Sequence, residues 1–424
     1  MNKIYDVSSK VLKQSITNCE DYFISFQQLA KENSLDEKER RLAIILINSF
    51  FRNYYFCKEV THFIVPLKEE NLDIVIIVGL YFCNNALVKV IDENEMEGIL
   101  KEELLKFNFD FSKEEHSLLA LKGVVREKRK TNDLKVRKGS PKYFSIKYNL
   151  PEWFYRMVVK HYDKDAGIKT CREFAHLPRQ FASINTFKAP VPNDENLTKN
   201  FTQISEGTYE YTGKAPFKRN ELVKNKNVIN IQLAYNDLLS KLPTLSHRNY
   251  AIYLGIKSYF YLPLISKYYK DYNFTTIITK HLKENYELLS IKREYNLKSL
   301  YFSEASSDGF ATVISKKQDL FIVFPSSSEF EKGRVNPDYL ITFDSNKLDE
   351  LIKGELADLE NAAPFVEEKG TLVYCVRTLG KKETTEIIAQ FLEKHPEFEL
   401  VEDKQYLPYE EENSLFYYAI LKRK

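Results

Sequence analysis

Glycine is scarce in this chain of 424 residues: there are 13, about 3% against an average near 7%. Because only glycine lets a main chain approach a phosphate or a cofactor closely, this shortage counts against an elaborate nucleotide site. Tyrosine and phenylalanine are abundant instead, with 28 and 29 residues. The balance of 43% hydrophobic and 29% charged residues is typical of a globular protein, and the length predicts about two to three domains.

Cysteine is also sparse, and its odd number and wide spacing predict neither disulfides nor a metal site. The five cysteines are Cys19, Cys57, Cys83, Cys171 and Cys375, and the seven histidines are equally scattered. The most apolar run, Ile74–Cys83, has about half the length that a bilayer span needs. The N-terminus lacks the apolar core of a signal peptide. We therefore expect a cytoplasmic protein that does not enter a membrane.

Charge of one sign is not in excess, since the formal net charge is only +2. The charges are unevenly placed, however. Residues 122–188 carry 17 Lys/Arg against 6 Asp/Glu, a net of +11, whereas residues 344–412 carry 8 against 18, a net of −10. A basic middle region is suited to a polyanion, although a solvated linker would give the same pattern.

Helical periodicity dominates residues 1–125, where apolar residues such as Leu42, Leu46 and Phe50 recur at spacings of three and four. Ser34 and Glu37 have the spacing of a capping box at the start of one helix. The basic stretch 126–142 indicates a linker or an exposed arm. Further on, Phe181–Lys188 alternates apolar and polar residues, which predicts a strand.

From about residue 228 onward, short apolar runs alternate with amphipathic stretches, which predicts a parallel, doubly wound sheet. The last run, Leu415–Leu421, is expected to be an edge strand that closes this sheet. The other predicted strands are Tyr250–Leu254, Thr275–Ile278, Leu300–Phe302, Leu320–Phe324 and Thr371–Val376. The predicted helices follow Leu254 up to Tyr269 and cover Leu282–Tyr295, Lys347–Phe365 and Glu383–Glu393.

Several short motifs resemble one family in their order and spacing. They are Tyr148–Trp153 (YNLPEW), Ser183–Lys188 (SINTFK), Asn336–Asp338 (NPD), Gly370–Tyr374 (GTLVY) and Leu392–Leu400 (LEKHPEFEL). Together they resemble the bacterial Sun-type (RsmB) 16S ribosomal RNA cytosine-C5 methyltransferases. The resemblance implies an α + α/β architecture: a NusB-like helical domain over residues 1–138, a small α+β RNA-binding domain over 139–225 and a Rossmann-like methyltransferase domain over 226–424. It also implies a monomer.

The residues that carry the family's chemistry are replaced here. Family members place a nucleophilic cysteine in a "TCS" triplet, which attacks cytosine C6. The aligned triplet is Val376–Thr378, and a protonated guanidinium, that of Arg377, stands at the nucleophile's position. In the family's "DAPCS" segment, Val323 replaces the aspartate and Ser326 replaces the second cysteine. Ser326 is one remaining candidate nucleophile. The other is Cys375, either displaced by two residues or a small buried residue of the strand.

The resemblance also implies a binding loop for S-adenosylmethionine, and its equivalents are degenerate. Tyr259 and Phe260 stand where the family has paired glycines, and Tyr253 precedes them on the strand. Lys280 lies where an acid would bind the ribose hydroxyls. We therefore expect no cofactor unless the enzyme interpretation holds, in which case it is S-adenosylmethionine. The surplus aromatic residues of this loop either fill the vacated volume or form a stacking platform for RNA.

Clustered cations give the clearest binding signal, because they release counterions when they meet a phosphate backbone. The candidate RNA-binding residues are Lys128, Arg129, Lys130, Lys135, Arg137, Lys138, Arg179 and Lys188. The single tryptophan, Trp153, is expected to anchor the core where two domains meet. The leading hypothesis is a protein that binds ribosomal RNA or the small ribosomal subunit and has lost methyl transfer. The alternatives are an active methyltransferase that uses Cys375, and a protein-interaction module acting through the helical domain.

Overall fold

The computed structural model describes residues 2–64, 71–107, 109, 136–185, 187, 195–244, 249–255, 274–280, 282 and 297–424. The chain forms two compact units. The first comprises Met1–His176 together with Lys332–Ser345, and the second comprises Leu177–Glu331 together with Asn346–Lys424. The polypeptide therefore leaves the first unit, returns to it for a short segment and leaves it again. The expected domain boundaries at residues 138 and 225 remain a prediction.

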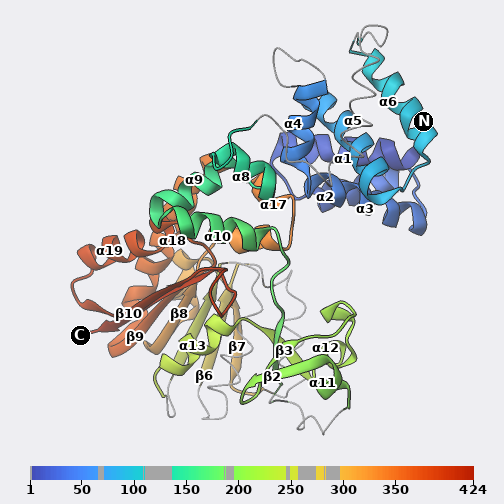
Figure 1. The fold of residues 1–424 in the computed structure, drawn as a ribbon. Coiled ribbons are helices and arrows are strands. Elements are labelled where there is room, and N and C mark those ends of the chain that lie inside the picture. Colours follow the sequence, from blue (N-terminus) through green and yellow to red (C-terminus); the bar gives the residue numbers. More distant parts are fainter. Residues whose placement is uncertain are drawn as a thin grey trace. The chain divides into compact units, whose positions relative to one another are not determined.

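The described part of the first unit is helical, as the apolar periodicity predicts (Figure 1). Its helices are α1 (Lys3–Asn18), α2 (Tyr22–Glu32), α3 (Glu37–Phe51), α4 (Tyr54–Ile64), α5 (Leu72–Cys83), η1 (Asn84–Val88), α6 (Glu93–Leu105), α8 (Pro141–Tyr148), α9 (Glu152–His161), α10 (Lys164–Phe174) and α17 (Tyr339–Thr342).

The helix α5 forms the centre of this unit, and its residues from Ile74 to Cys83 are all buried. A helix that is apolar on every side must be surrounded by other helices. At Gly79, an added Cβ atom would lie 2.4 Å from the ring of Phe50, so the missing side chain permits close packing against α3. The apolar run noted in the sequence is therefore a core helix. None of the described helices has the length and apolar character needed to cross a membrane.

The start of α3 is two residues later than predicted. Asp36, not Ser34, is the N-cap: its carboxylate accepts a hydrogen bond from the main-chain N–H of Glu39 at 2.8 Å, and the Glu39 carboxylate accepts one from the N–H of Asp36 at 2.9 Å. Ser34 lies outside the helix with a left-handed φ of 51°. Two overlapping sequences with the same spacing compete here, and the one whose cap is an anion, which the helix dipole favours, is used.

The returning segment Lys332–Ser345 is part of the first unit's packing. Phe343 contacts Trp153, with their ring centroids 5.8 Å apart, and Ile341 packs against the helical core. Asp338, from the segment that resembles the family's "NPD" motif, accepts a hydrogen bond from the N–H of Tyr22 at 3.5 Å. Trp153 thus anchors a segment that is distant in sequence but belongs to the same unit.

The second unit contains two sheets and the helices that cover them. Its strands are β1 (Phe181–Ile184), β2 (Phe201–Ser205), β3 (Thr208–Tyr211), β4 (Val228–Ile231), β5 (Asn249–Leu254), β6 (Phe274–Thr279), β7 (Leu300–Glu304), β8 (Gln318–Phe324), β9 (Val366–Val376), β10 (Phe398–Tyr406) and β11 (Phe416–Arg423). Its described helices are α11 (Glu195–Asn200), η2 (Phe217–Arg219), α12 (Glu221–Lys224), α13 (Leu233–Lys241), η4 (Ser307–Gly309), α16 (Phe310–Val313), η6 (Ser345–Lys347), α18 (Leu348–Ala362), η7 (Ala363–Phe365), η8 (Lys381–Glu383) and α19 (Thr385–Lys394). The turn η5 (Phe330–Arg334) spans the passage into the returning segment.

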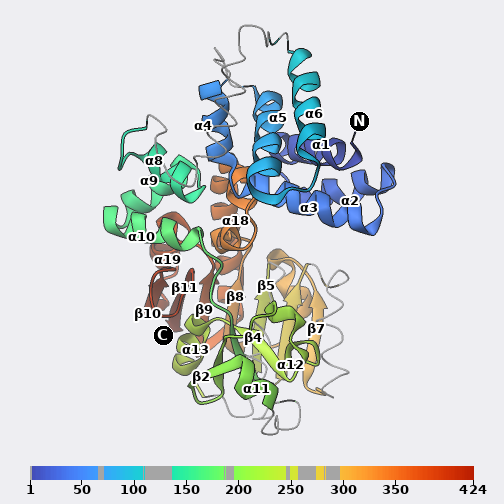
Figure 2. The same cartoon turned by 45° about the vertical axis from the view of Figure 1, so that its right-hand side comes forward.

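The larger sheet has seven strands in the order β10-β11-β9-β8-β5-β6-β7. Neighbours among β9, β8, β5, β6 and β7 are parallel, which confirms the predicted parallel sheet, and β9, β8 and β5 lie side by side in Figure 2. The prediction for the last apolar run is wrong in one respect. The strand β11 does not form the edge, because it pairs antiparallel with both β9 and β10. The edge is β10, which the apolar pattern did not predict.

Alternate residues of each central strand point to opposite faces of this sheet. Ile252 joins a core beneath α13, whereas Tyr253 joins a second core beneath α18 and α19. The smaller sheet is antiparallel with the order β2-β3-β1-β4. Its strand β1 begins at Phe181 as predicted and ends at Ile184. Both faces of the larger sheet are thus covered, and the loops at the strand ends are the natural place for a site.

Candidate functional site

The parallel strands β5, β6, β8 and β9 end at one edge of the larger sheet, where their following loops meet. The register pairs Tyr253 with Val323 and Val323 with Tyr374, so the predicted chemical positions lie on neighbouring strands. In α/β sheets of this kind, ligands bind outside the carboxyl ends of the strands. This edge is therefore the candidate site.

Three of the predicted site residues are buried in the hydrophobic cores of the second unit. Tyr253 and Val323 are fully buried in the core beneath α18, and Cys375 is 1% exposed in the opposite core beneath α13. Burial raises the pKa of the Cys375 thiol well above its ordinary value. A thiol that stays protonated is a poor nucleophile, because the thiolate is the reactive form.

Ser326 has a different role, since its hydroxyl donates a hydrogen bond to the main-chain oxygen of Gly255 at 2.7 Å. The N–H of Gly255 in turn donates to the oxygen of Phe324 at 2.8 Å. A Cβ atom at Gly255 would lie 2.8 Å from the main-chain nitrogen of Ser326. The absence of a side chain at Gly255 therefore serves the contact between the loops that follow β5 and β8.

Arg377 forms an ion pair with Glu329, which joins the loop after β9 to the loop after β8. The side chains of Arg377 and Glu329 are only 16% and 7% exposed. Burial lowers the pKa of the guanidinium. Glu329 has a left-handed φ of 45°, which is uncommon for a residue with a side chain and is a local source of backbone strain. The position that the resemblance assigns to a nucleophile thus holds a paired cation.

A buried carboxylate ties the same two loops together and was not predicted from the sequence. Glu383 is 1% exposed and accepts hydrogen bonds from the N–H of Ser328 at 2.7 Å, from the hydroxyl of Ser328 at 2.8 Å and from the hydroxyl of Thr378 at 3.0 Å. Thr378 lies next to Arg377 in the sequence, but nothing in the sequence pattern indicates that Ser328 lies close to Glu383. These hydrogen bonds rigidify the edge of the sheet.

The cofactor positions are only partly within the described residues. Lys280 is exposed at the end of β6, and its charge acts on the carboxyl of Asp358. Burial nevertheless raises the pKa of Asp358, because that cost outweighs the hydrogen bond from Ser307 and the attraction of Lys280. Tyr259 and Phe260 lie outside the described residues.

The predicted RNA-binding residues are distributed over both units. Arg137 and Lys138 are exposed in the first unit. In the second, the Arg179 guanidinium forms a two-point ion pair with Glu210, with one contact of 2.7 Å, and lies over the ring of Phe181. A phosphate would have to compete with Glu210 for Arg179. Five further candidates lie outside the described residues: Lys128, Arg129, Lys130, Lys135 and Lys188.

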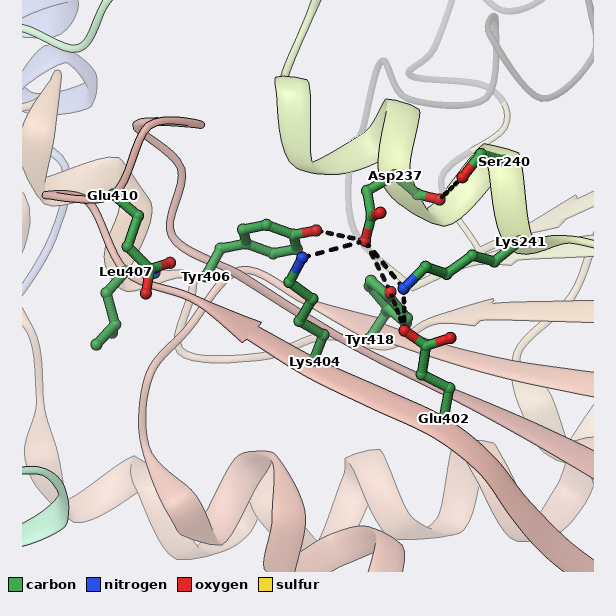
Figure 3. Close-up of polar contacts among 9 residues, drawn as sticks. All are labelled: Asp237, Ser240, Lys241, Glu402, Lys404, Tyr406, Leu407, Glu410 and Tyr418. Atoms are coloured by element: carbon green, nitrogen blue, oxygen red, sulfur yellow. Dashed lines mark hydrogen bonds and ion pairs between the residues drawn. The ribbon is translucent and has the colours of Figure 1, made fainter.

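A polar cluster on the other face of the sheet was also not predicted, and Figure 3 shows its members around Asp237. This carboxylate of α13 accepts hydrogen bonds from the hydroxyls of Tyr406 and Tyr418, the latter at 2.9 Å, and pairs with Lys241 at 3.5 Å and Lys404 at 3.6 Å. Partial burial opposes its ionisation, but the hydrogen bonds and the lysines outweigh that cost and lower the pKa of Asp237. The cluster fastens α13 to β10 and β11.

The described side chains that could ligate a metal ion are dispersed. Among the described residues, no three His, Cys, Asp or Glu side chains gather closely enough to hold a metal ion. None of the described cysteines forms a disulfide bond.

Comparison with known proteins gives a short sequence match and a fold match over the full length. No protein-family model matches the chain. Over 88 residues the chain is 33% identical to the probable ribosomal RNA small subunit methyltransferase B of Bacillus subtilis (strain 168). This stretch covers 21% of the chain and 20% of that relative.

Among solved structures, the fold of PH0851 matches 100% of this chain and 99% of its own, with a TM-score of 0.71 and 13% identity. A methyltransferase homologue from Pyrococcus horikoshii covers 66% of this chain, and 98% of its own length is matched, with a TM-score of 0.54 and 12% identity. NSun6 from the same organism, solved with SFG, covers 64% of this chain, with 98% of its own length matched, a TM-score of 0.55 and 8% identity. At these identities the likeness shows the fold alone: the larger sheet has a Rossmann-like fold, as in these solved structures.

Proposed function

We propose that the chain is related to the Sun-type (RsmB) family of ribosomal RNA methyltransferases, binds RNA and has lost the family's methyl transfer. The substrate and the partner implied by that relationship are ribosomal RNA and the small ribosomal subunit. Because the matched stretch covers only a fifth of the curated relative, its activity cannot be transferred as a whole. The residues of this chain must carry the argument.

The observation that carries the proposal is the state of Arg377. It occupies the position of the family's nucleophilic cysteine and is committed to an ion pair with Glu329. Val323, at the position of the base-contacting aspartate, is buried and offers no polar atom. Formation of a covalent adduct at cytosine C6 requires a thiolate. Neither Arg377 nor buried, protonated Cys375 supplies one.

The described part of the cofactor site also fits S-adenosylmethionine poorly. Lys280 stands where a carboxylate would bind the ribose hydroxyls, and a lysine cannot accept a hydrogen bond. Gly255, the one glycine left on the approach to the loop, is used for packing against Ser326. This supports a loss of cofactor binding. If the cofactor were bound at this edge, it would supply the methyl group, and Gly255 and Lys280 would lie beside it.

RNA binding is supported by the charge distribution and by the fold. Residues 122–188 carry a net charge of +11, and Arg137 and Lys138 are exposed within them. We propose that the N-terminal helices form a NusB-like domain over residues 1–138, that residues 139–225 form the small RNA-binding domain and that the protein acts as a cytoplasmic monomer. A protein partner at the helical domain is the second candidate. The exposed apolar side chains of Phe23 and Ile24 on α2 favour it.

Calorimetric titration of the full chain with S-adenosylmethionine tests the loss of the cofactor. We expect no binding at micromolar concentrations, and a saturable isotherm would contradict the proposal. Bisulfite sequencing of ribosomal RNA from cells with and without the gene tests the loss of catalysis. We expect identical patterns, whereas a cytosine that is protected only when the gene is present would establish an active methyltransferase and contradict the loss of catalysis.

RNA binding is tested with the double variant R137A/K138A against small-subunit ribosomal RNA over a range of salt concentrations. Each lost phosphate contact reduces the slope of log K against log [salt] by about 0.7 to 0.9. The matched control is K316A/K317A, which removes an adjacent exposed pair of lysines in the second unit. Equal affinities and slopes for both variants and the parent would remove Arg137 and Lys138 from the RNA-binding surface.

A further inference from the structure

Beneath the joined loops of the candidate site lies a second buried acid. The hydroxyl of Tyr374, on β9, is 2.8 Å from the main-chain oxygen of Glu383 and 3.1 Å from Oε2 of Glu355, and it shares its proton between them. Glu355 lies on α18 and is 0% exposed. Its carboxyl group interacts with that of Glu383, and burial together with this interaction raises the pKa of Glu355. Two carboxyl groups and one phenol therefore meet away from water.

The hydrogen-bond donors and acceptors around Glu355 and Glu383 balance only if one of the two carboxyl groups is protonated. A carboxylate only accepts hydrogen bonds, so two ionised carboxyl groups cannot bond to each other. Both oxygens of Glu383 already accept from Ser328 or Thr378. Oε1 of Glu355, in contrast, accepts no hydrogen bond from any donor of the described residues. An O–H group on Glu355 satisfies this buried atom and supplies the donor that the pair lacks.

We propose that Glu355 holds a proton at neutral pH and donates it to Glu383, and that this proton keeps the loops after β8 and β9 joined. Glu383 is the group to which Ser328 and Thr378 bind, so anything that displaces its carboxylate releases both loops. The proposal concerns the order of the candidate site and holds whether or not the chain binds RNA.

The charged surroundings favour a bound proton. Burial raises the pKa of Glu355 well above its ordinary value, and the charge of Glu383 raises it further. The other titratable groups acting on the pair are also acids: Asp358 on the same helix, Tyr374 on β9 and, through Tyr374, Tyr417 on β11. Ionisation of Glu355 would place a second negative charge beside Glu383 at low dielectric.

The direction of the pH effect follows from this shift. The folded pKa of Glu355 lies above its unfolded value, so its contribution to stability is complete below the unfolded value near pH 4.5 and is lost as pH rises to the folded pKa. Over that interval the folded state holds one proton more than the unfolded state. The unfolding constant of the parent protein therefore rises by up to about tenfold per pH unit from this group.

The test compares the full chain with E355Q, whose neutral amide donates to Glu383 without a titration. Urea unfolding is measured at several values from pH 5 to pH 9. We expect the ratio of the parent's unfolding constant to that of E355Q to increase with pH. The control is E350Q, on the exposed side of the same helix α18, which should leave the pH dependence of the parent unchanged.

Infrared spectroscopy gives a second test, which relies on the folded parent protein and therefore still applies if E355Q does not fold. The parent at neutral pH should have a carbonyl band of a protonated carboxylic acid that is absent from E355Q and present in E350Q. Protection of the Ser328 amide against hydrogen exchange should fall at alkaline pH in the parent and in E350Q but not in E355Q. The proposal is overturned if the parent lacks that band or if E355Q and the parent have parallel pH profiles.

Discussion

Trp153 packs on Phe343 across a large separation in sequence, with ring centroids 5.8 Å apart and an interplanar angle of 36°. The pair holds the returning segment Lys332–Ser345 in the helical unit. Ile341 and Asp338 make further contacts from the same segment. The helical unit is therefore completed by residues that follow the strand β8.

Replacement of Phe343 by alanine should destabilise the first unit by about 1 to 3 kcal/mol, because a half-buried aromatic ring loses its packing. Urea unfolding followed by tryptophan fluorescence measures this change directly, since Trp153 is the only tryptophan. F23A is the matched control, because the Phe23 ring is 45% exposed on the same unit. If F343A and F23A unfold at the same urea concentration, the returning segment does not stabilise the helices.

Replacement of Arg377 by alanine should cost about 3 to 5 kcal/mol, because Glu329 is then left buried without its cation. The double variant E329Q/R377M removes both charges and should be more stable than R377A. Chemical denaturation of the full chain measures the variants of both units. As a control, R41A breaks the exposed pair of Arg41 and Glu37 and should cost at most about 0.5 kcal/mol. Equal losses in R377A and R41A would contradict a buried ion pair.

Replacement of Asp237 by asparagine should destabilise the second unit by about 1 to 2 kcal/mol at neutral pH, because the hydroxyls of Tyr406 and Tyr418 then donate to an uncharged group. The folded pKa of Asp237 is lowered, so its contribution is present above the unfolded value and is lost as pH falls through the folded pKa. The difference between the parent and D237N should therefore shrink in acid. D349N is the control, since Asp349 is 76% exposed. A difference that does not shrink as the pH is lowered would refute this account.

An added methyl group should have opposite effects on stability at two glycines of the second unit, because the surroundings of the two glycines differ. In G255A the new Cβ meets main-chain atoms of Pro325 and Ser326, which should cost about 1 to 3 kcal/mol. In G354A the new Cβ of α18 meets nothing within 4 Å, and the variant should be more stable by about 0.5 to 1 kcal/mol. Thermal unfolding of both variants measures the contrast. Changes of the same sign would mean that Gly255 is not a packing residue.

Much of the sheet was predictable because its central strands are buried on both faces. Such strands form continuous apolar runs, and the runs at Tyr250–Leu254 and Leu320–Phe324 correspond to β5 and β8. The strand β10 was missed because an edge strand has few apolar residues: Glu399, Glu402 and Asp403 interrupt its pattern. Because β10 was not predicted, β11 was predicted to be the edge strand.

The candidate site was less predictable, because its contacts join loops that are distant in sequence. The replacement of the family's cysteine by Arg377 is visible in the sequence, but its partner Glu329 lies 48 residues earlier. Glu383 was assigned only to the start of a helix, and its role depends on Ser328 and Glu355 coming close in space. Cys375 is buried because both faces of β9 are covered at this point, so the alternation along the strand decides only which of the two cores it joins.

The returning segment prevents the two units from being separated by a single cut of the chain. Since Lys332–Ser345 belongs to the first unit, the covalent chain connects the two units at three places, after His176, after Glu331 and after Ser345. A protease that cuts once, at any of these places, leaves two polypeptides that remain held together by folded structure. A fragment that ends at residue 176 lacks a piece of its own unit, and no single truncation of this chain separates the complete helical unit from the second unit.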